Sequence, residues 1–114
     1  MSTKDWGPCT WKTIHHFTMA YPWDPTPHDK QAMMTFLNSI CYNLPCKECK
    51  MHCSQYMSKH PPNLTSSCEL QKWAFNFHNN INVRLGKPQF TVAQYQRKYG
   101  TAVKIHRENR LKGK

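Results

Sequence analysis

The spacing of apolar residues is the feature that most restricts the fold of this chain. Between Pro27 and Pro45 they recur at intervals of three and four residues, which is the period of an amphipathic helix. These positions are Met33, Phe36, Leu37, Ile40, Cys41 and Leu44. The run 26–29 (TPHD) supplies an N-cap threonine, a proline at the first helical position and an acid in the first turn. No segment of the chain alternates as a β-strand does.

Prolines and glycines divide the remaining sequence into further helical segments. They predict helices over residues 7–21, 45–60 and 66–85, and a short helix from about Thr91 to Tyr99. The third of these segments opens on a capping box, S-x-x-E, and ends before a Gly-x-Pro sequence. We therefore predict an all-α protein, a four-helix bundle with a short fifth helix, whose core can hold a cofactor between facing helices.

The chain is basic, with 16 Lys and Arg against 6 Asp and Glu in 114 residues. Residues 97–114 carry seven of these bases and one acid. We expect one domain over residues 1–100 and a basic, solvated C-terminal tail over residues 101–114. No aromatic residue is interleaved in 104–114, so we do not expect nucleic-acid binding. The positive charge elsewhere suits a cofactor that carries phosphate.

Two features bear on the compartment. No apolar run approaches the roughly 20 residues that cross a bilayer, so we expect no membrane span. The N-terminus lacks the charged-then-apolar pattern of a signal peptide, and we expect neither a secretion nor a transit signal. Six cysteines in a chain without such a signal favour metal binding or redox chemistry over a disulfide framework.

Two of the cysteines form a CxxC motif, Cys46 to Cys49. Residues i and i+3 share one face of a helix and lie close enough to form a disulfide. Pro45 places Cys46 in the first helical turn, where the helix dipole, together with Lys47 and Lys50, favours a thiolate. This pattern predicts a reactive dithiol.

A structural zinc site is the alternative. Its ligands would be Cys46, Cys49, either His52 or Cys53, and Cys68, although a second C-x2-C pair is missing. Three pairings of the remaining cysteines are open, and the sequence does not choose among them. These cysteines are Cys9, Cys41, Cys53 and Cys68. A third hypothesis is a helical interaction protein whose cysteines are structural or incidental.

Two further clusters stand out. Trp11 and His15 are an i, i+4 pair that, taken alone, indicates part of a helical core. The run 78–82 (HNNIN) places three asparagines and a histidine within about one and a half turns. Because asparagine is a poor helix former and its amide needs partners when buried, this run suggests hydrogen bonding to an extended polar ligand. A solvated helix face explains the pattern equally well.

Together these motifs resemble the ERV/ALR family of FAD-linked sulfhydryl oxidases. The matching stretches are WGPCTWKTIH at 6–15, PCKECKMH at 45–52, WAFNFHNNIN at 73–82 and RLGKP at 84–88. They occur in the family's order over about residues 6–100. Each motif is weak by itself, whereas three in order, the third continued by the stretch 84–88, with compatible helix breaks are a specific signal.

The resemblance implies a helical bundle that holds FAD beside the CxxC. Cys49 is expected next to the flavin, and Cys46 is expected to be the outer thiol that exchanges with a dithiol of a thioredoxin-like or other partner protein. Electrons would pass through FAD to O2, giving H2O2. The resemblance also implies a homodimer formed through the first two helices. The implied cofactor-binding residues are Thr10, Trp11, His15, His52, His78, Asn79, Asn82, Lys87 and Tyr95.

The chain departs from the family pattern in two places. Cellular members often carry a structural disulfide at the positions of Phe75 and Val92, and an aromatic residue at the position of Leu44. Both departures resemble the compact members found in large cytoplasmic DNA viruses, for which the host cytoplasm and the virion are the expected locations. Such enzymes often relay electrons through a second cysteine pair, and Cys9 is the candidate for that role.

Overall fold

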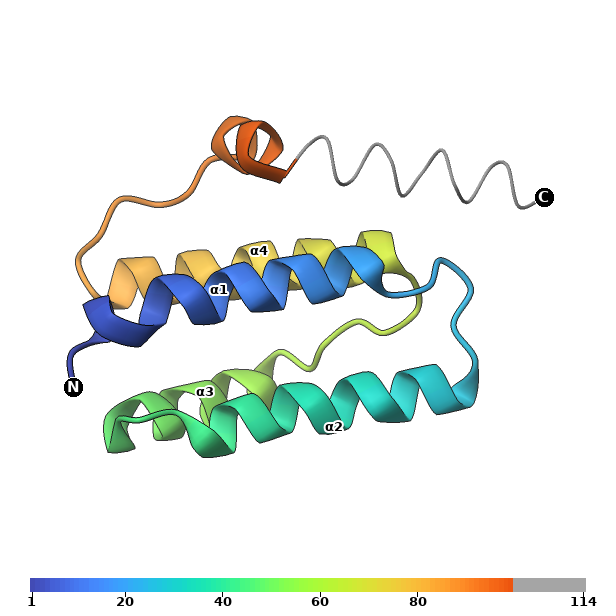
Figure 1. The fold of residues 1–114 in the computed structure, drawn as a ribbon, viewed down its shortest axis with the longest axis horizontal. Coiled ribbons are helices and arrows are strands. Elements are labelled where there is room, and N and C mark those ends of the chain that lie inside the picture. The colour runs from blue at the N-terminus through green and yellow to red at the C-terminus, as the bar shows by residue number, and fades with distance from the viewer. Residues whose placement is uncertain (100–114) are drawn as a thin grey trace.

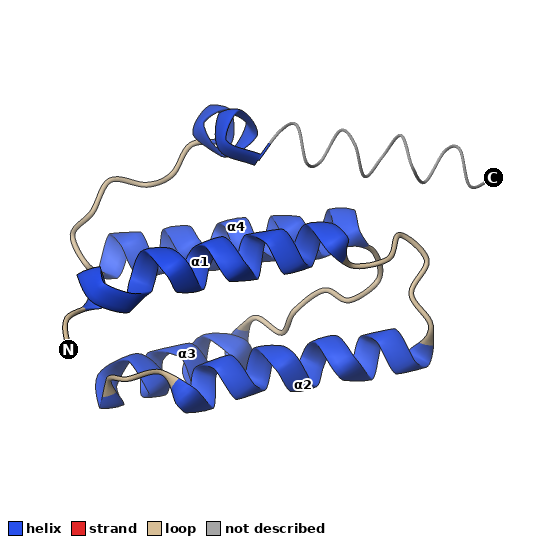
Figure 2. Cartoon of the chain, in the orientation of Figure 1, coloured by secondary structure: helices blue, strands red, loops and turns tan. Residues whose placement is uncertain are grey.

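The structure is a computed structural model and describes residues 1–99. It contains four long helices, α1 (Thr3–Ala20), α2 (Pro27–Asn43), α3 (Lys47–Lys59) and α4 (Ser67–Arg84). A shorter helix follows over residues 92–99, and the described residues contain no strand (Figures 1 and 2). The predicted all-α architecture, with four main helices and a short fifth one, is confirmed. The predicted basic tail, 101–114, lies outside the described residues.

Helix α1 begins earlier than the sequence predicted, at Thr3 rather than at residue 7. Ser2 and Asp5 form a capping box, in which Ser2 Oγ accepts from the Lys4 N–H at 3.2 Å and the Asp5 carboxylate accepts from the Ser2 N–H at 2.9 Å. Pro8 therefore lies inside the helix, where it removes one backbone hydrogen bond. The prediction was wrong because it gave the proline more weight than this N-terminal cap.

The other helix ends follow local chemistry more closely. Thr26 is the predicted N-cap of α2, and together with Asp29, the predicted first-turn acid, it forms a capping box. Ser66 caps α4 by accepting from the Glu69 N–H at 3.2 Å. The Glu69 carboxylate accepts instead from Lys72 Nζ at 3.3 Å, so only half of the capping box predicted for Ser66 and Glu69 forms. Gly86, at φ 70°, follows the end of α4 in the left-handed conformation that glycine adopts without strain.

The bundle consists of two helical pairs, α1 packed on α4 and α2 packed on α3 (Figure 1). Helices α1 and α4 run antiparallel. Ser67 at the start of α4 accordingly donates its hydroxyl to the carbonyl of Thr18 near the end of α1, at 2.8 Å. The buried apolar cluster between the pairs comprises Ile14, Tyr21, Leu37, Cys41, Cys53, Met57, Leu70, Trp73, Ala74 and Phe77. Most of these positions belong to the helical periodicity in the sequence. None of the helices in the described part of the chain combines the length and the apolar character that a membrane crossing requires.

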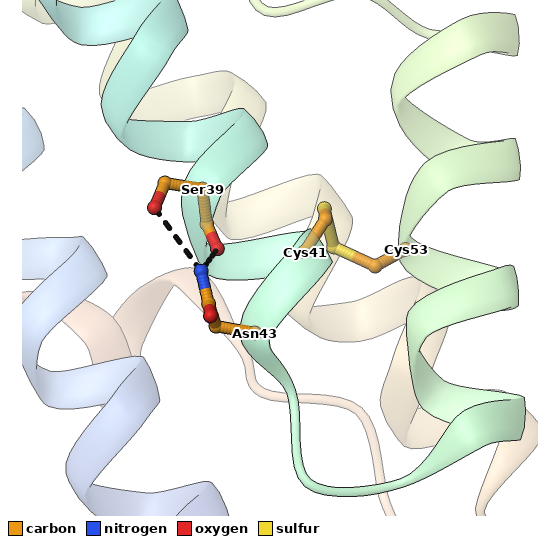
Figure 3. Close-up of a disulfide and its surroundings, with 4 residues drawn as sticks. All are labelled: Ser39, Cys41, Asn43 and Cys53. Atoms are coloured by element: carbon orange, nitrogen blue, oxygen red, sulfur yellow. Dashed lines mark hydrogen bonds between the residues drawn. A yellow bond between two sulfur atoms is a disulfide. The ribbon is translucent and has the colours of Figure 1, made fainter.

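A disulfide joins Cys41 of α2 to Cys53 of α3, with a Cα–Cα distance of 5.4 Å (Figure 3). This bond chooses one of the three pairings that the sequence left open. Cys9 and Cys68 are free. Cys68 lies at the end of the α1/α4 pair where Ser67 meets Thr18, whereas Cys9 is nine residues earlier on α1, about 13 Å along the helix axis. These two thiols are therefore too far apart to pair within one chain.

Candidate active site

The CxxC dithiol lies at the start of α3. Cys46 is the N-cap of the helix rather than a residue of its first turn, and its Sγ accepts from the backbone N–H of Cys49 at 3.3 Å. Hydrogen bonds from the Cys49 thiol and from the Cys49 backbone lower the pKa of Cys46. Burial, followed by hydrogen bonding to Cys46, raises the pKa of Cys49 to about 11. In the reduced pair Cys46 is therefore the thiol that ionises first, as the helix dipole predicts.

A cavity of about 270 Å³ lies behind this dithiol, between α1, α3 and α4, with Ile40 of α2 also in its wall. Most of the wall is apolar, and Cys49 and Cys53 line it from α3. Seven of the residues predicted from the sequence meet in this wall. They are Thr10, Trp11, Cys49, His52, His78, Asn82 and Lys87.

Aromatic rings form one side of the cavity. The Trp11 and His78 rings stack with centroids 4.1 Å apart and planes 5° from parallel. Phe77 and Trp11 form a T-shaped pair, with centroids 5.1 Å apart and planes at 76°. Offset and edge-to-face contacts of this kind favour fixed ring positions. The cavity therefore offers a rigid flat surface rather than a set of mobile side chains.

Three cationic side chains, Arg84, Lys87 and Lys98, also line the cavity. Of these three, only Lys87 was predicted from the sequence as a cofactor-binding residue. Arg84 stood in the matching stretch 84–88, and Lys98 was counted among the bases near the tail. Trp6, in the first matching stretch, also lines the cavity, and its Nε1 is buried without a hydrogen-bond partner among the described residues. The signal for Trp6 and Arg84 was thus present in the motifs.

Three predicted cofactor residues lie outside this wall and support it from behind. His15 is fully buried, and its Nε2 is 2.9 Å from Nδ1 of His78. The Asn79 amide forms hydrogen bonds with both the N–H and the carbonyl of Phe90, which fixes the segment after α4. Tyr95 donates its hydroxyl to Gln71 Oε1 at 3.1 Å. Direct contact of these three residues with a cofactor stays a prediction.

The zinc alternative is not supported. Cys53, which was the alternative to His52 as one of its ligands, is bonded to Cys41. Residues 1–99 hold no group of three or more His, Cys, Asp and Glu side chains that is arranged for a metal ion. The fold and the site instead define a class of protein: a helical redox protein with an asymmetric dithiol beside a cavity that suits a flat, anionic cofactor.

Comparisons with known proteins give the family. The model of the Erv1/Alr family matches residues 8–100. The chain is 32% identical over 98 residues to the FAD-linked sulfhydryl oxidase of African swine fever virus (isolate Tick/Malawi/Lil 20-1/1983), covering 86% of this chain and 82% of the relative. It is 35% identical over 101 residues to a putative FAD-linked sulfhydryl oxidase of Invertebrate iridescent virus 6, covering 82% and 91%. The crystal structure of the FAD-binding domain of Erv1 from Saccharomyces cerevisiae superposes with a TM-score of 0.82 at 28% identity, covering 90% of this chain and 97% of that domain. The chain belongs to the Erv1/Alr family.

Proposed function

We infer that this protein is an FAD-linked sulfhydryl oxidase, which converts dithiols to disulfides through Cys46 and Cys49. The observation that carries this inference is the asymmetry of the pair. Cys49 lines the aromatic cavity, whereas Cys46 is not part of the cavity wall and has the lower pKa of the two thiols. One thiol thus faces a cofactor and the other is available for exchange.

The residues of the cavity fit FAD. Its apolar wall and its stacked rings suit the flat isoalloxazine or adenine systems, and Arg84, Lys87 and Lys98 suit the diphosphate. The Trp6 Nε1–H, buried and unpaired among the described residues, is a donor that a polar ligand atom can satisfy. At about 270 Å³ the cavity is slightly below the usual range of small-molecule pockets, so it encloses only part of a dinucleotide.

The thiol chemistry follows from the two cysteines. A substrate thiolate attacks Sγ of Cys46 in the oxidised Cys46–Cys49 pair, forming a mixed disulfide and releasing Cys49 as a thiolate. The second substrate thiol then attacks the substrate sulfur of this mixed disulfide and expels Cys46. Because a thiol of low pKa leaves readily, the lowered pKa of Cys46 favours this second step. The substrate has then lost two electrons and two protons, and the cysteine pair is reduced.

When bound, FAD would supply the acceptor for the two electrons of the reduced pair and the chemistry that reduces dioxygen to hydrogen peroxide. The chain's own contribution is to hold Cys49 in the wall of the cavity and to exclude water with the apolar side chains around it. The protein substrate that we propose is a thioredoxin-like or other protein with a pair of reactive thiols.

We also propose a homodimer formed through α1 and α2. In support, Phe17 of α1 stacks on Phe36 of α2 with centroids 5.0 Å apart, yet 49% of Phe17 remains exposed. Phe36 is partly buried against the core, so Phe17 is the exposed member of the pair, and we place it at the interface. Sedimentation equilibrium is expected to give twice the chain mass, and a mass near 13.5 kDa would contradict the dimer.

Oxygen consumption with a small dithiol tests the activity. The purified protein is expected to be yellow and to consume oxygen when dithiothreitol is added. Cys46→Ser and Cys49→Ser are each expected to abolish this consumption while the flavin absorbance remains. Cys68→Ser, which removes a free thiol outside the cavity wall, is the matched control and keeps the activity. Normal turnover in Cys49→Ser, or a colourless protein made with ample riboflavin, would refute the assignment.

A further inference from the structure

A pair of histidines lies at the back of the cavity, with one ring behind the other. His78 is in the wall and stacks on Trp11, whereas His15 is fully buried and does not line the cavity. Nε2 of His15 and Nδ1 of His78 are 2.9 Å apart, a hydrogen-bond distance. Because a neutral imidazole has one donor and one acceptor nitrogen, this bond links the tautomers of the two rings.

The two possible arrangements differ in what they leave unpaired. If His78 donates, His15 must carry its proton on Nδ1, a buried nitrogen without a partner among the described residues. That would orphan an N–H donor in the interior, a situation that native structures rarely tolerate. If His15 donates instead, its Nδ1 is an unprotonated acceptor. Both rings are then the Nε2–H form, which is also the tautomer that neutral histidine prefers in isolation.

Both rings are neutral at physiological pH, so the choice of tautomer is meaningful. Burial, followed by the neighbouring His78, lowers the pKa of His15 from 6.5 to about 3. Burial, followed by Lys98 and Lys87, lowers the pKa of His78 from 6.5 to about 4. The ring nitrogens of His78 form no other hydrogen bond to residues 1–99. Its Nε2 is therefore available to a ligand in the cavity.

We propose that His15 is a positioning residue that holds His78 in the Nε2–H tautomer, so that His78 presents a hydrogen-bond donor, and not an acceptor, to the bound cofactor. His15 donates from Nε2 to His78 Nδ1, and the His78 proton is thereby restricted to Nε2. The stack on Trp11 fixes the plane of the His78 ring, and the bond from His15 fixes its rotation within that plane. The statement about the cofactor rests on the proposed function, whereas the assignment of the tautomer does not.

Nitrogen-15 NMR of the labelled protein measures the tautomer directly, because protonated and unprotonated ring nitrogens resonate far apart. A His78→Gln variant identifies the His78 signals. In the wild type we expect His78 to be protonated at Nε2 and unprotonated at Nδ1, with and without flavin. A His78 ring protonated at Nδ1 would overturn the proposal, and the tautomer itself is measured on the unsubstituted protein.

The His15→Met variant tests the role of His15. Methionine has a similar length and suits a helix, but it cannot donate a hydrogen bond. We expect the Nδ1–H form of His78 to rise severalfold, and FAD to bind roughly fivefold more weakly in a titration of flavin-free protein. The matched control is His16→Met, one position along α1 on an exposed residue, which changes neither readout.

The outcomes separate the two claims. An unchanged His78 tautomer in His15→Met would remove the positioning role of His15. A shifted tautomer with unchanged FAD affinity would show that the His78 donor does not face the cofactor. Failure of the wild type to bind FAD at all would refute the proposed function and leave the tautomer assignment standing on its NMR signals.

Discussion

Removal of the disulfide between Cys41 and Cys53 is expected to destabilise the protein by about 4 kcal/mol. The two cysteines are 12 residues apart in sequence. Closing a loop of this length removes chain entropy from the unfolded state that corresponds to about 3 kcal/mol. Both side chains are only 4% exposed, so replacing them with alanine leaves small cavities that add about 1 kcal/mol. This loss is a large fraction of the stability of a typical small domain.

The assay is unfolding in urea of the Cys41→Ala/Cys53→Ala double variant, followed by tryptophan fluorescence, to which the buried Trp73 contributes. Wild type and variant are compared without flavin, because a ligand that binds the folded state adds its own stabilisation. The m-value should rise as well as the midpoint fall, since the unlinked unfolded chain exposes more surface.

The matched control is Cys9→Ala/Cys68→Ala, which also removes two sulfur atoms but no cross-link. We expect it to lose less than about 1 kcal/mol, because one of the thiols is exposed and neither bridges two helices. A loss below about 1 kcal/mol in the disulfide variant, with no change in m-value, would refute the loop-entropy reasoning.

Three further predictions concern stability. Asn79→Ala removes both hydrogen bonds to the Phe90 backbone and is expected to lower the free energy of unfolding by about 2 kcal/mol in urea. Gly86→Ala places a side chain at φ 70° and is expected to lower it by about 1 kcal/mol, whereas an unchanged midpoint would show that the loop relaxes. Because the folded pKa values of His15 and His78 lie below 6.5, stability should be complete above about pH 6.5 and fall towards acid, by about 1 kcal/mol per pH unit for His15 alone. Urea midpoints that stay constant between about pH 6 and pH 4 would contradict the burial of these rings.

The helices could be predicted because their ends depend on local chemistry. The boundary of α2 follows from Thr26, Pro27 and Asp29, whose effects need no tertiary contact. The start of α1 was missed because the sequence pattern does not show whether the stabilisation from the Ser2 cap exceeds the cost of Pro8 inside the helix. In general, a motif reveals that a helix can begin, and the balance of cap and breaker decides where.

The sequence predicted which residues belong to the candidate site better than it predicted how deeply each of them is buried. Helical spacing places Trp11 and His15 on one face of α1, but it does not reveal that His15 is fully buried behind His78. Tyr95 is held by Gln71 on α4, a contact between residues that no sequence pattern connects. The pairing of Cys41 with Cys53 likewise depends on how α2 packs on α3, and all three pairings were equally compatible with the sequence.

The position of the disulfide explains how a thiol-exchange site can have a fixed geometry. The bond ties α2 to α3 on either side of the CxxC, which lies within the 12-residue loop that it closes. The helix that carries Cys49 is thus held against the cavity by a link that does not depend on the redox state of the CxxC itself. Cys53 is one turn beyond Cys49, yet only 4% of it is exposed, so an incoming substrate thiolate meets Cys46 rather than the structural bond.

The short fifth helix, in contrast, is held against the bundle without a disulfide. Phe75 of α4 packs edge-on against Tyr95, with centroids 5.7 Å apart, and Tyr95 donates to Gln71. Together with the two bonds from Asn79 to Phe90, these contacts hold the segment that follows α4 over the buried ring of His15. Because none of them involves sulfur, this part of the fold is expected to survive reducing conditions, and only the α2/α3 pair depends on a disulfide. Strong reductant should therefore loosen the CxxC helix while the Trp11–His78 stack between α1 and α4 stays intact.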